Sequence, residues 1–143
     1  MSENKLYQVR IKVSEKLSED LRSGGQTKSA NTIFEISKKY DVSLICTLNA
    51  FYEYCKEAED NEISKYPLYH WTKSVIDDPV KSAKHIRSFA FYKGLEQVYK
   101  KKLADKLYFE LKILLERKII EKLNLIDNDP KNNPQAPAIS ISK

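Results

Sequence analysis

Three polar side chains near the amino terminus, Gln8, Arg10 and Lys12, stand at alternate positions in an otherwise apolar run. An amide and two cations are hydrogen-bond donors that suit a polar or anionic partner. In an extended strand alternate side chains share a face, so these three would lie together. The apolar residues on the other face would be Tyr7, Val9, Ile11 and Val13. The segment 6–13 is therefore predicted to be a strand with one buried face and one basic polar face.

The segment 80–124 holds a second group of candidate anion ligands, because it contains twelve Lys or Arg against five Asp or Glu. Such a block attracts nucleic acid, an acidic protein or an anionic membrane surface, although a solvated helix face has the same composition. The candidate phosphate contacts in this block are Arg87, Lys93, Lys100, Lys101 and Lys102.

Residues that could support catalysis or hold a metal are few. The two histidines, His70 and His85, have no Cys, Asp or Glu at the spacing of a metal site. Cys46 and Cys55 lie in no nucleophile motif, and the sequence has no glycine-rich phosphate loop. The sequence therefore predicts a protein that is not an enzyme and that uses no metal or cofactor.

The elements that would position these residues are mostly helical. Only three glycines and five prolines interrupt 143 residues, which favours long helices over a many-stranded sheet. Helix caps and apolar periodicity place helices at about 15–23, 29–40, 43–57 and 79–124, the last either continuous or broken near 94–102. We predict a mainly α fold with one N-terminal β-strand and a long amphipathic C-terminal helical region. Residues 1–126 would form a single domain, and 127–143 have the composition of a disordered tail.

One segment allows two interpretations. Val42, Leu44, Cys46 and Leu48 alternate as in a strand, and apolar residues from Leu44 to Cys55 also recur at helical spacing. The helical interpretation is preferred because these residues cover more than one stripe of a helix, as expected for a buried element.

The order of elements over residues 6–40 resembles the ribbon-helix-helix family of DNA-binding dimers. A strand with polar residues at alternate positions is followed by a helix, a Gly24-Gly25 turn and a second helix opened by hydroxyl residues. The resemblance implies that the strands of two subunits pair into a ribbon that enters the major groove, where the three polar strand residues touch base edges. It also implies that Thr27 and Ser29, with the backbone amides that follow them, hold a phosphate at the N-terminus of the second helix. The first helix of this chain is about a turn shorter than is usual in that family.

Two further patterns point to nucleic acid. Residues 33–51 resemble a helix-turn-helix with Asp41 in place of the usual turn glycine, but aliphatic residues stand where base reading needs donors and acceptors. A helical hairpin in a core explains those residues better. Aromatic residues interleaved with Lys or Arg, at 87–93 and 99–102, fit base stacking in single-stranded nucleic acid, although aromatics at helical spacing more often belong to a core.

Together these features predict an accessory or regulatory protein that binds nucleic acid, with DNA as the expected ligand, and acts as a homodimer. The alternative is a helical interaction or assembly protein with a protein partner and no nucleic-acid role. Its interface would include Leu107, Leu111, Leu114 and Ile119. Two reduced thiols and the lack of an apolar run that spans a bilayer favour a cytoplasmic protein that is not bound to a membrane.

Overall fold

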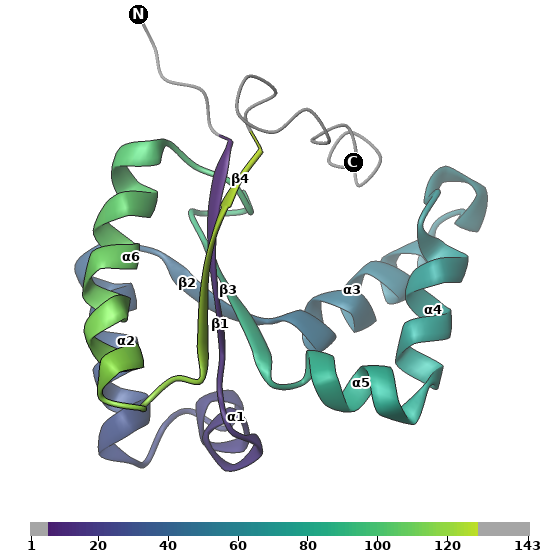
Figure 1. The fold of residues 1–143 in the computed structure, drawn as a ribbon. Coiled ribbons are helices and arrows are strands. Elements are labelled where there is room, and N and C mark those ends of the chain that lie inside the picture. Colours follow the sequence, from purple (N-terminus) through teal and green to yellow (C-terminus); the bar gives the residue numbers. More distant parts are fainter. Residues whose placement is uncertain (1–5, 129–143) are drawn as a thin grey trace, which may run out of the picture.

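The computed structural model describes residues 6–128, which form a four-stranded sheet with two helices against one face and a helical lobe beside the other (Figure 1). The strands are β1 (Tyr7–Lys12), β2 (Ser43–Cys46), β3 (Ser88–Tyr92) and β4 (Lys122–Asp127). The helices are α1 (Glu15–Arg22), α2 (Lys28–Lys39), α3 (Thr47–Asp60), α4 (Tyr69–Asp77), α5 (Pro79–His85) and α6 (Lys101–Glu116), with a 3-10 turn at Ile63–Lys65. No helix in this part of the chain has the length and apolar content that crossing a membrane requires.

The strands follow the order β2-β3-β1-β4, and each neighbouring pair is antiparallel. β1 and β2 therefore run parallel to each other with β3 between them. This doubly split β-α-β connectivity is that of ferredoxin-like folds, here with α3, α4 and α5 inserted between β2 and β3. A fold of this kind hosts unrelated functions, so function has to be argued from the residues on it.

The expectation of a single N-terminal strand is wrong, because the chain forms three more strands in the described part. The segment 79–124, predicted as a helix that is continuous or broken near 94–102, is interrupted as the second alternative allows, because α6 begins at Lys101. It is not helical throughout, since β3 follows α5 and β4 begins at Lys122. The segment 42–48 combines both interpretations, since β2 ends at Cys46 and α3 begins at Thr47. The predicted tail begins inside β4, and from residue 129 it lies outside the described residues.

β1 has no free edge. Its backbone pairs with β4 along the whole strand and with β3 from Arg10 to Lys12. At its other end Tyr7 exchanges two backbone hydrogen bonds with Tyr99, and the Val9 N–H donates to the Tyr99 hydroxyl at 2.9 Å. The ribbon between two copies that the family resemblance implies is therefore not available to β1, because both of its edges are occupied within the chain.

The main core lies between one sheet face and the helices α2 and α6. The alternate apolar residues of β1 pack there with Phe89 and Phe91 of β3 and with the apolar stripe of α6. Within that stripe Leu107 and Leu111 are fully buried and Leu114 nearly so, while Ile119 packs against the same core. The predicted partner interface is thus wrong for these leucines, because the chain's own sheet covers them.

Several helix starts predicted from capping residues are confirmed. The Ser14 hydroxyl accepts a hydrogen bond from the Leu17 N–H at the start of α1. Asp78 caps α5, which has Pro79 at its first position. Gly25 has a φ of 81°, and a Cβ there would lie 2.6 Å from the ring of Phe34, so the α1–α2 turn requires glycine.

Candidate anion-binding site on the polar sheet face

The sheet face turned away from α2 and α6 carries the polar side chains of β1, and we call it the polar face. Residues directly opposite each other in antiparallel strands share a face, so Gln8, Arg10 and Lys12 lie together as their alternation predicts. Their neighbours on this face from β4 and β3 are Ile126, Asn124, Lys122, Ser88, Ala90 and Tyr92. The lobe formed by α3, α4 and α5 stands on this side of the sheet (Figure 1).

Lys12 and Lys122 stand directly opposite each other in the β1–β4 ladder. Like charges in such positions destabilise a sheet. Within residues 6–128 neither side chain forms an ion pair with an acid, and the same holds for Lys84 of α5. Desolvation, followed by repulsion from Lys122, Arg87 and Lys84, lowers the pKa of Lys12. We call these four residues the cationic cluster.

Arg87 enters the cluster from the connection between α5 and β3. Its Nε donates to the Val13 carbonyl at 2.9 Å, and its Nη2 forms an ion pair with Glu121. The backbone adds two contacts here: the Val13 N–H donates to the Arg87 carbonyl at 3.0 Å, and the Glu121 N–H donates to the Lys12 carbonyl at 2.7 Å. These hydrogen bonds fix the end of β1 beside β4 and the end of α5.

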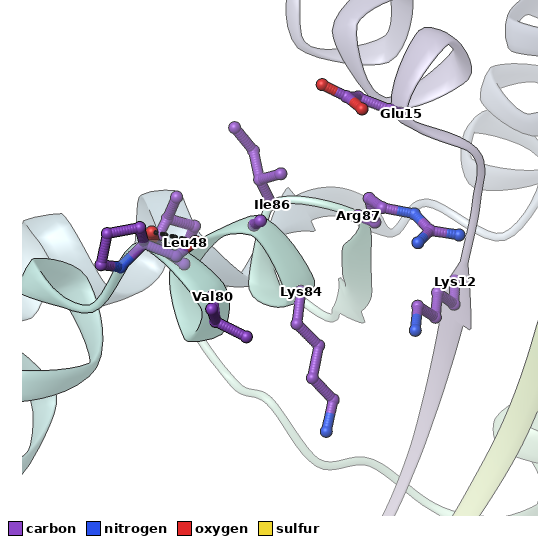
Figure 2. A pocket seen from close by; sticks show the side chains of 10 residues that line it. Lys12, Glu15, Leu48, Val80, Lys84, Ile86 and Arg87 are labelled. Atoms are coloured by element: carbon purple, nitrogen blue, oxygen red, sulfur yellow. Dashed lines mark hydrogen bonds between the residues drawn. The ribbon is translucent and has the colours of Figure 1, made fainter.

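An open pocket of about 600 Å³ lies beside the cationic cluster. Lys12, Lys84 and Arg87 line it together with Glu15, and Leu48, Val80 and Ile86 supply apolar surface. Figure 2 shows the side chains of Lys84 and Lys12 reaching from α5 and β1 into the same space, with the Arg87 guanidinium near Lys12. Three cations and one carboxylate around an open pocket favour binding of an anion.

Arg10 continues the row of cations along β1 and has only an uncharged partner. Its Nε donates to Gln8 Oε1 at 2.7 Å, and no acidic side chain of the described segment forms an ion pair with it. Burial lowers the pKa of the guanidinium, opposed by Tyr92 and Tyr99. Gln8 is 3% exposed, and its Nε2 is the one buried side-chain polar atom between residues 6 and 128 that lacks a hydrogen-bond partner.

Replacing Gln8 by Glu is expected to raise the free energy of unfolding by about 1 kcal/mol, because a carboxylate accepts from Arg10 and leaves no donor unpaired. The gain should be present at neutral pH and disappear as the pH falls through the carboxyl range, because pairing with Arg10 lowers the carboxyl pKa in the folded state. Urea denaturation at two pH values measures both effects. Gln8→Met, which leaves the Arg10 Nε without an acceptor, should destabilise. A Gln8→Glu protein less stable than the parent at neutral pH would contradict this geometry.

Thr27 and Ser29 lie elsewhere, in a second pocket of about 690 Å³ at the α1–α2 turn. The Thr27 hydroxyl donates to Asp20 at 2.6 Å and accepts from the Ala30 N–H at 3.2 Å. Asp20 also accepts from the backbone N–H groups of Gln26 and Thr27, and these hydrogen bonds lower its pKa. The Asp20 carboxylate thus accepts the hydrogen bonds that the family resemblance assigns to a phosphate at this turn.

The remaining predicted lysines lie at the opposite end of the sheet from Lys12. Lys93 follows β3 and forms an ion pair with Asp41 at 3.3 Å, while Lys101 pairs with Asp105 at 2.8 Å. Lys100 and Lys102 are exposed at the start of α6, next to the Tyr7–Tyr99 pairing. Of the predicted contacts, the structure brings together Arg10, Lys12 and Arg87. It adds Lys84 and Lys122, which no spacing in the sequence singled out.

Three of the four aromatic residues of 87–93 and 99–102 cannot stack bases as the sequence suggested, because Phe89, Phe91 and Tyr99 are at most 3% exposed, while Tyr92 is partly exposed. In contrast, an aromatic side chain of the helical lobe is exposed. Trp71 of α4 is 55% exposed, and its ring lies edge-on to Phe51 of α3, with 5.9 Å between ring centroids.

Metal chemistry and nucleophile chemistry find no support in the described residues. No three His, Cys, Asp or Glu side chains there are placed to hold a metal ion. Cys46 and Cys55 are buried free thiols, and burial together with Glu59 raises the pKa of Cys55, which disfavours its thiolate. No protein-family model, curated protein or solved structure matches this chain.

Proposed function

We propose that this protein binds nucleic acid and holds its phosphates with the cationic cluster and Arg10. The observation that carries the proposal is the pair of opposed cations, Lys12 and Lys122, which the sheet retains without an acidic partner from the described residues. Natural proteins keep destabilising groups where activity needs them. A phosphate between the two ammonium groups would relieve their repulsion.

The spread of the charges favours a polyanion over a single small anion. The cations run across the sheet from Lys122 of β4 through Lys12 of β1 to Lys84 of α5. Arg10 lies two residues along β1 from Lys12, a separation of about 7 Å at the usual strand rise. A row of cations beside an open pocket suits the successive phosphates of a chain, and the net charge of +5 adds a general attraction.

Fluorescence anisotropy of a labelled 20-nucleotide DNA, titrated with the full chain at several salt concentrations, tests this function. Five phosphate contacts should make the logarithm of the binding constant fall with the logarithm of salt concentration with a slope of about −3.5 for a single strand. Absence of binding at micromolar protein in low salt would refute the function. Binding with no salt dependence would refute it equally, because counterion release is the physical consequence of phosphate contacts.

Lys122→Glu is expected to change binding and stability in opposite directions. The new carboxylate pairs across the strands with Lys12, so Tm should rise, while affinity for DNA should fall. A rise in Tm excludes unfolding as the cause of weaker binding. Lys112→Glu, an exposed position on α6, changes the net charge equally and serves as the matched control. Equal loss of affinity in both variants would assign the effect to net charge instead of the site.

The alternative function, protein interaction or assembly, is favoured by one observation on the outer side of α6. Phe109 and Ile113 lie one helical turn apart and are 71% and 49% exposed. Isolated apolar side chains of this kind are common on monomer surfaces, so this observation is weaker than the opposed cations. A homodimer remains a proposal, and any such dimer would use a surface other than the edges of β1.

A further inference from the structure

We propose that the nucleic acid bound here is single-stranded and that its bases stack on an aromatic strip formed by His85, Phe51 and Trp71. The inference rests on the proposed function, because the cationic cluster supplies the phosphate contacts. The strip supplies stacking contacts with the bases, which lysine ammonium groups cannot make.

The three rings form a continuous path across the helical lobe. Trp71 of α4 contacts Phe51 of α3 at 5.9 Å with an interplanar angle of 73°, and Phe51 contacts His85 of α5 at 5.1 Å. Each ring comes from a different helix, so the path depends on how the lobe packs and not on a local sequence pattern. At one end Trp71 is 55% exposed.

At its other end the strip reaches the cations. His85 directly follows Lys84 in α5, and its pKa is lowered by burial and by the charges of Lys84 and Arg10. Arg10 therefore lies within electrostatic range of the His85 ring. A strand whose phosphates contact Arg10 thus has the first ring of the strip near that contact, and the strip leads from there across the helical lobe to Trp71.

The chemistry of the strip selects unpaired bases. In a duplex the bases stack on one another inside the helix, so their faces do not reach a protein ring. In a single strand each base has a free π-face, and stacking on an aromatic side chain strengthens binding with little regard to sequence. An indole that stays half exposed while its edge rests on Phe51 suits this role, because binding a base would bury its apolar surface.

The chain contains one tryptophan, so its intrinsic fluorescence reports on Trp71 alone. Titration with an unlabelled 20-nucleotide single strand should quench this fluorescence, while the corresponding duplex should cause little quenching and bind about tenfold more weakly or worse. Trp71→Ala should lower affinity for the single strand about tenfold and leave both the duplex affinity and the salt slope unchanged. Trp71→Phe, which keeps a ring, should restore most of the affinity.

Tyr52→Ala is the matched control, because Tyr52 is an exposed aromatic on α3 outside the three-ring path. Its affinity for the single strand should equal that of the parent. Equal affinity for single strand and duplex, with the expected salt slope but no quenching, would overturn this inference and leave the proposed function intact. Absence of binding to either probe would overturn both.

Discussion

Replacing Lys12 and Lys84 together by glutamate is expected to weaken binding of a single-stranded oligonucleotide about 100-fold or more. The change removes two phosphate contacts and places two carboxylates where phosphates would lie. The salt slope should change from about −3.5 to about −2, because two of the five phosphate contacts are lost. Anisotropy titrations at matched salt concentrations measure both quantities.

This double variant should remain folded. Lys84 is exposed on α5, and Glu at position 12 would stand opposite Lys122, an attractive pair in place of a repulsive one. A matched control is Lys38→Glu with Lys112→Glu, two exposed positions on the helices that cover the other sheet face. An unchanged affinity in the Lys12 and Lys84 variant, or the same loss in the control, would show that the cationic cluster does not bind the phosphates.

Leu111→Ala is expected to lower the free energy of unfolding by about 3 kcal/mol, within the range of about 2–5 kcal/mol for buried leucines. The side chain is fully buried between α6 and the sheet, so its removal leaves a cavity in the core. Urea denaturation measures this loss. The native mass of the same samples should stay unchanged, because a change in mass is what a role of Leu111 in a partner interface would cause.

Phe109→Ala is the control for this prediction, because Phe109 lies on the same helix and is 71% exposed. Its effect on stability should stay within about 0.5 kcal/mol. If Leu111→Ala instead altered the native mass and left stability unchanged, α6 would not pack on the sheet as described. The polar face would then not be the sheet face opposite the core.

The strand β1 could be predicted from the sequence because the alternation of apolar and polar residues lies within the strand itself. Val9 and Ile11 face the core and Arg10 and Lys12 the polar face, as period two requires. The caps at Ser14 and Asp78 were readable for the same reason, since a cap bonds to residues two or three positions away.

β2 was weighed as an alternative to a helix, but β3 and β4 were missed because distant partners define them. Ser88 of β3 pairs with Lys12, and Lys122 of β4 pairs with the same residue from the other side. β4 lies at the end of an apolar pattern that α6 begins, and its Leu123 follows Ile119 at helical spacing. Short segments of this kind take their conformation from tertiary pairing, which overrides local propensity.

The same distinction explains the candidate site. Arg10 and Lys12 follow from alternation, and Arg87 was included because it lies in the basic block. Lys122 could not be selected, because only the β1–β4 register places it opposite Lys12. The path through Phe51 and Trp71 depends on the packing of three helices, and no spacing in the sequence indicates it.

The most direct measurement is a map of amide chemical-shift changes in the isotopically labelled full chain during titration with a single-stranded oligonucleotide. The proposed site requires the largest changes at Lys12, Lys84, Arg87 and Lys122, with a shift of the Trp71 indole N–H. Changes confined to the second pocket, around Thr27 and Lys118, with none near the cationic cluster, would contradict it.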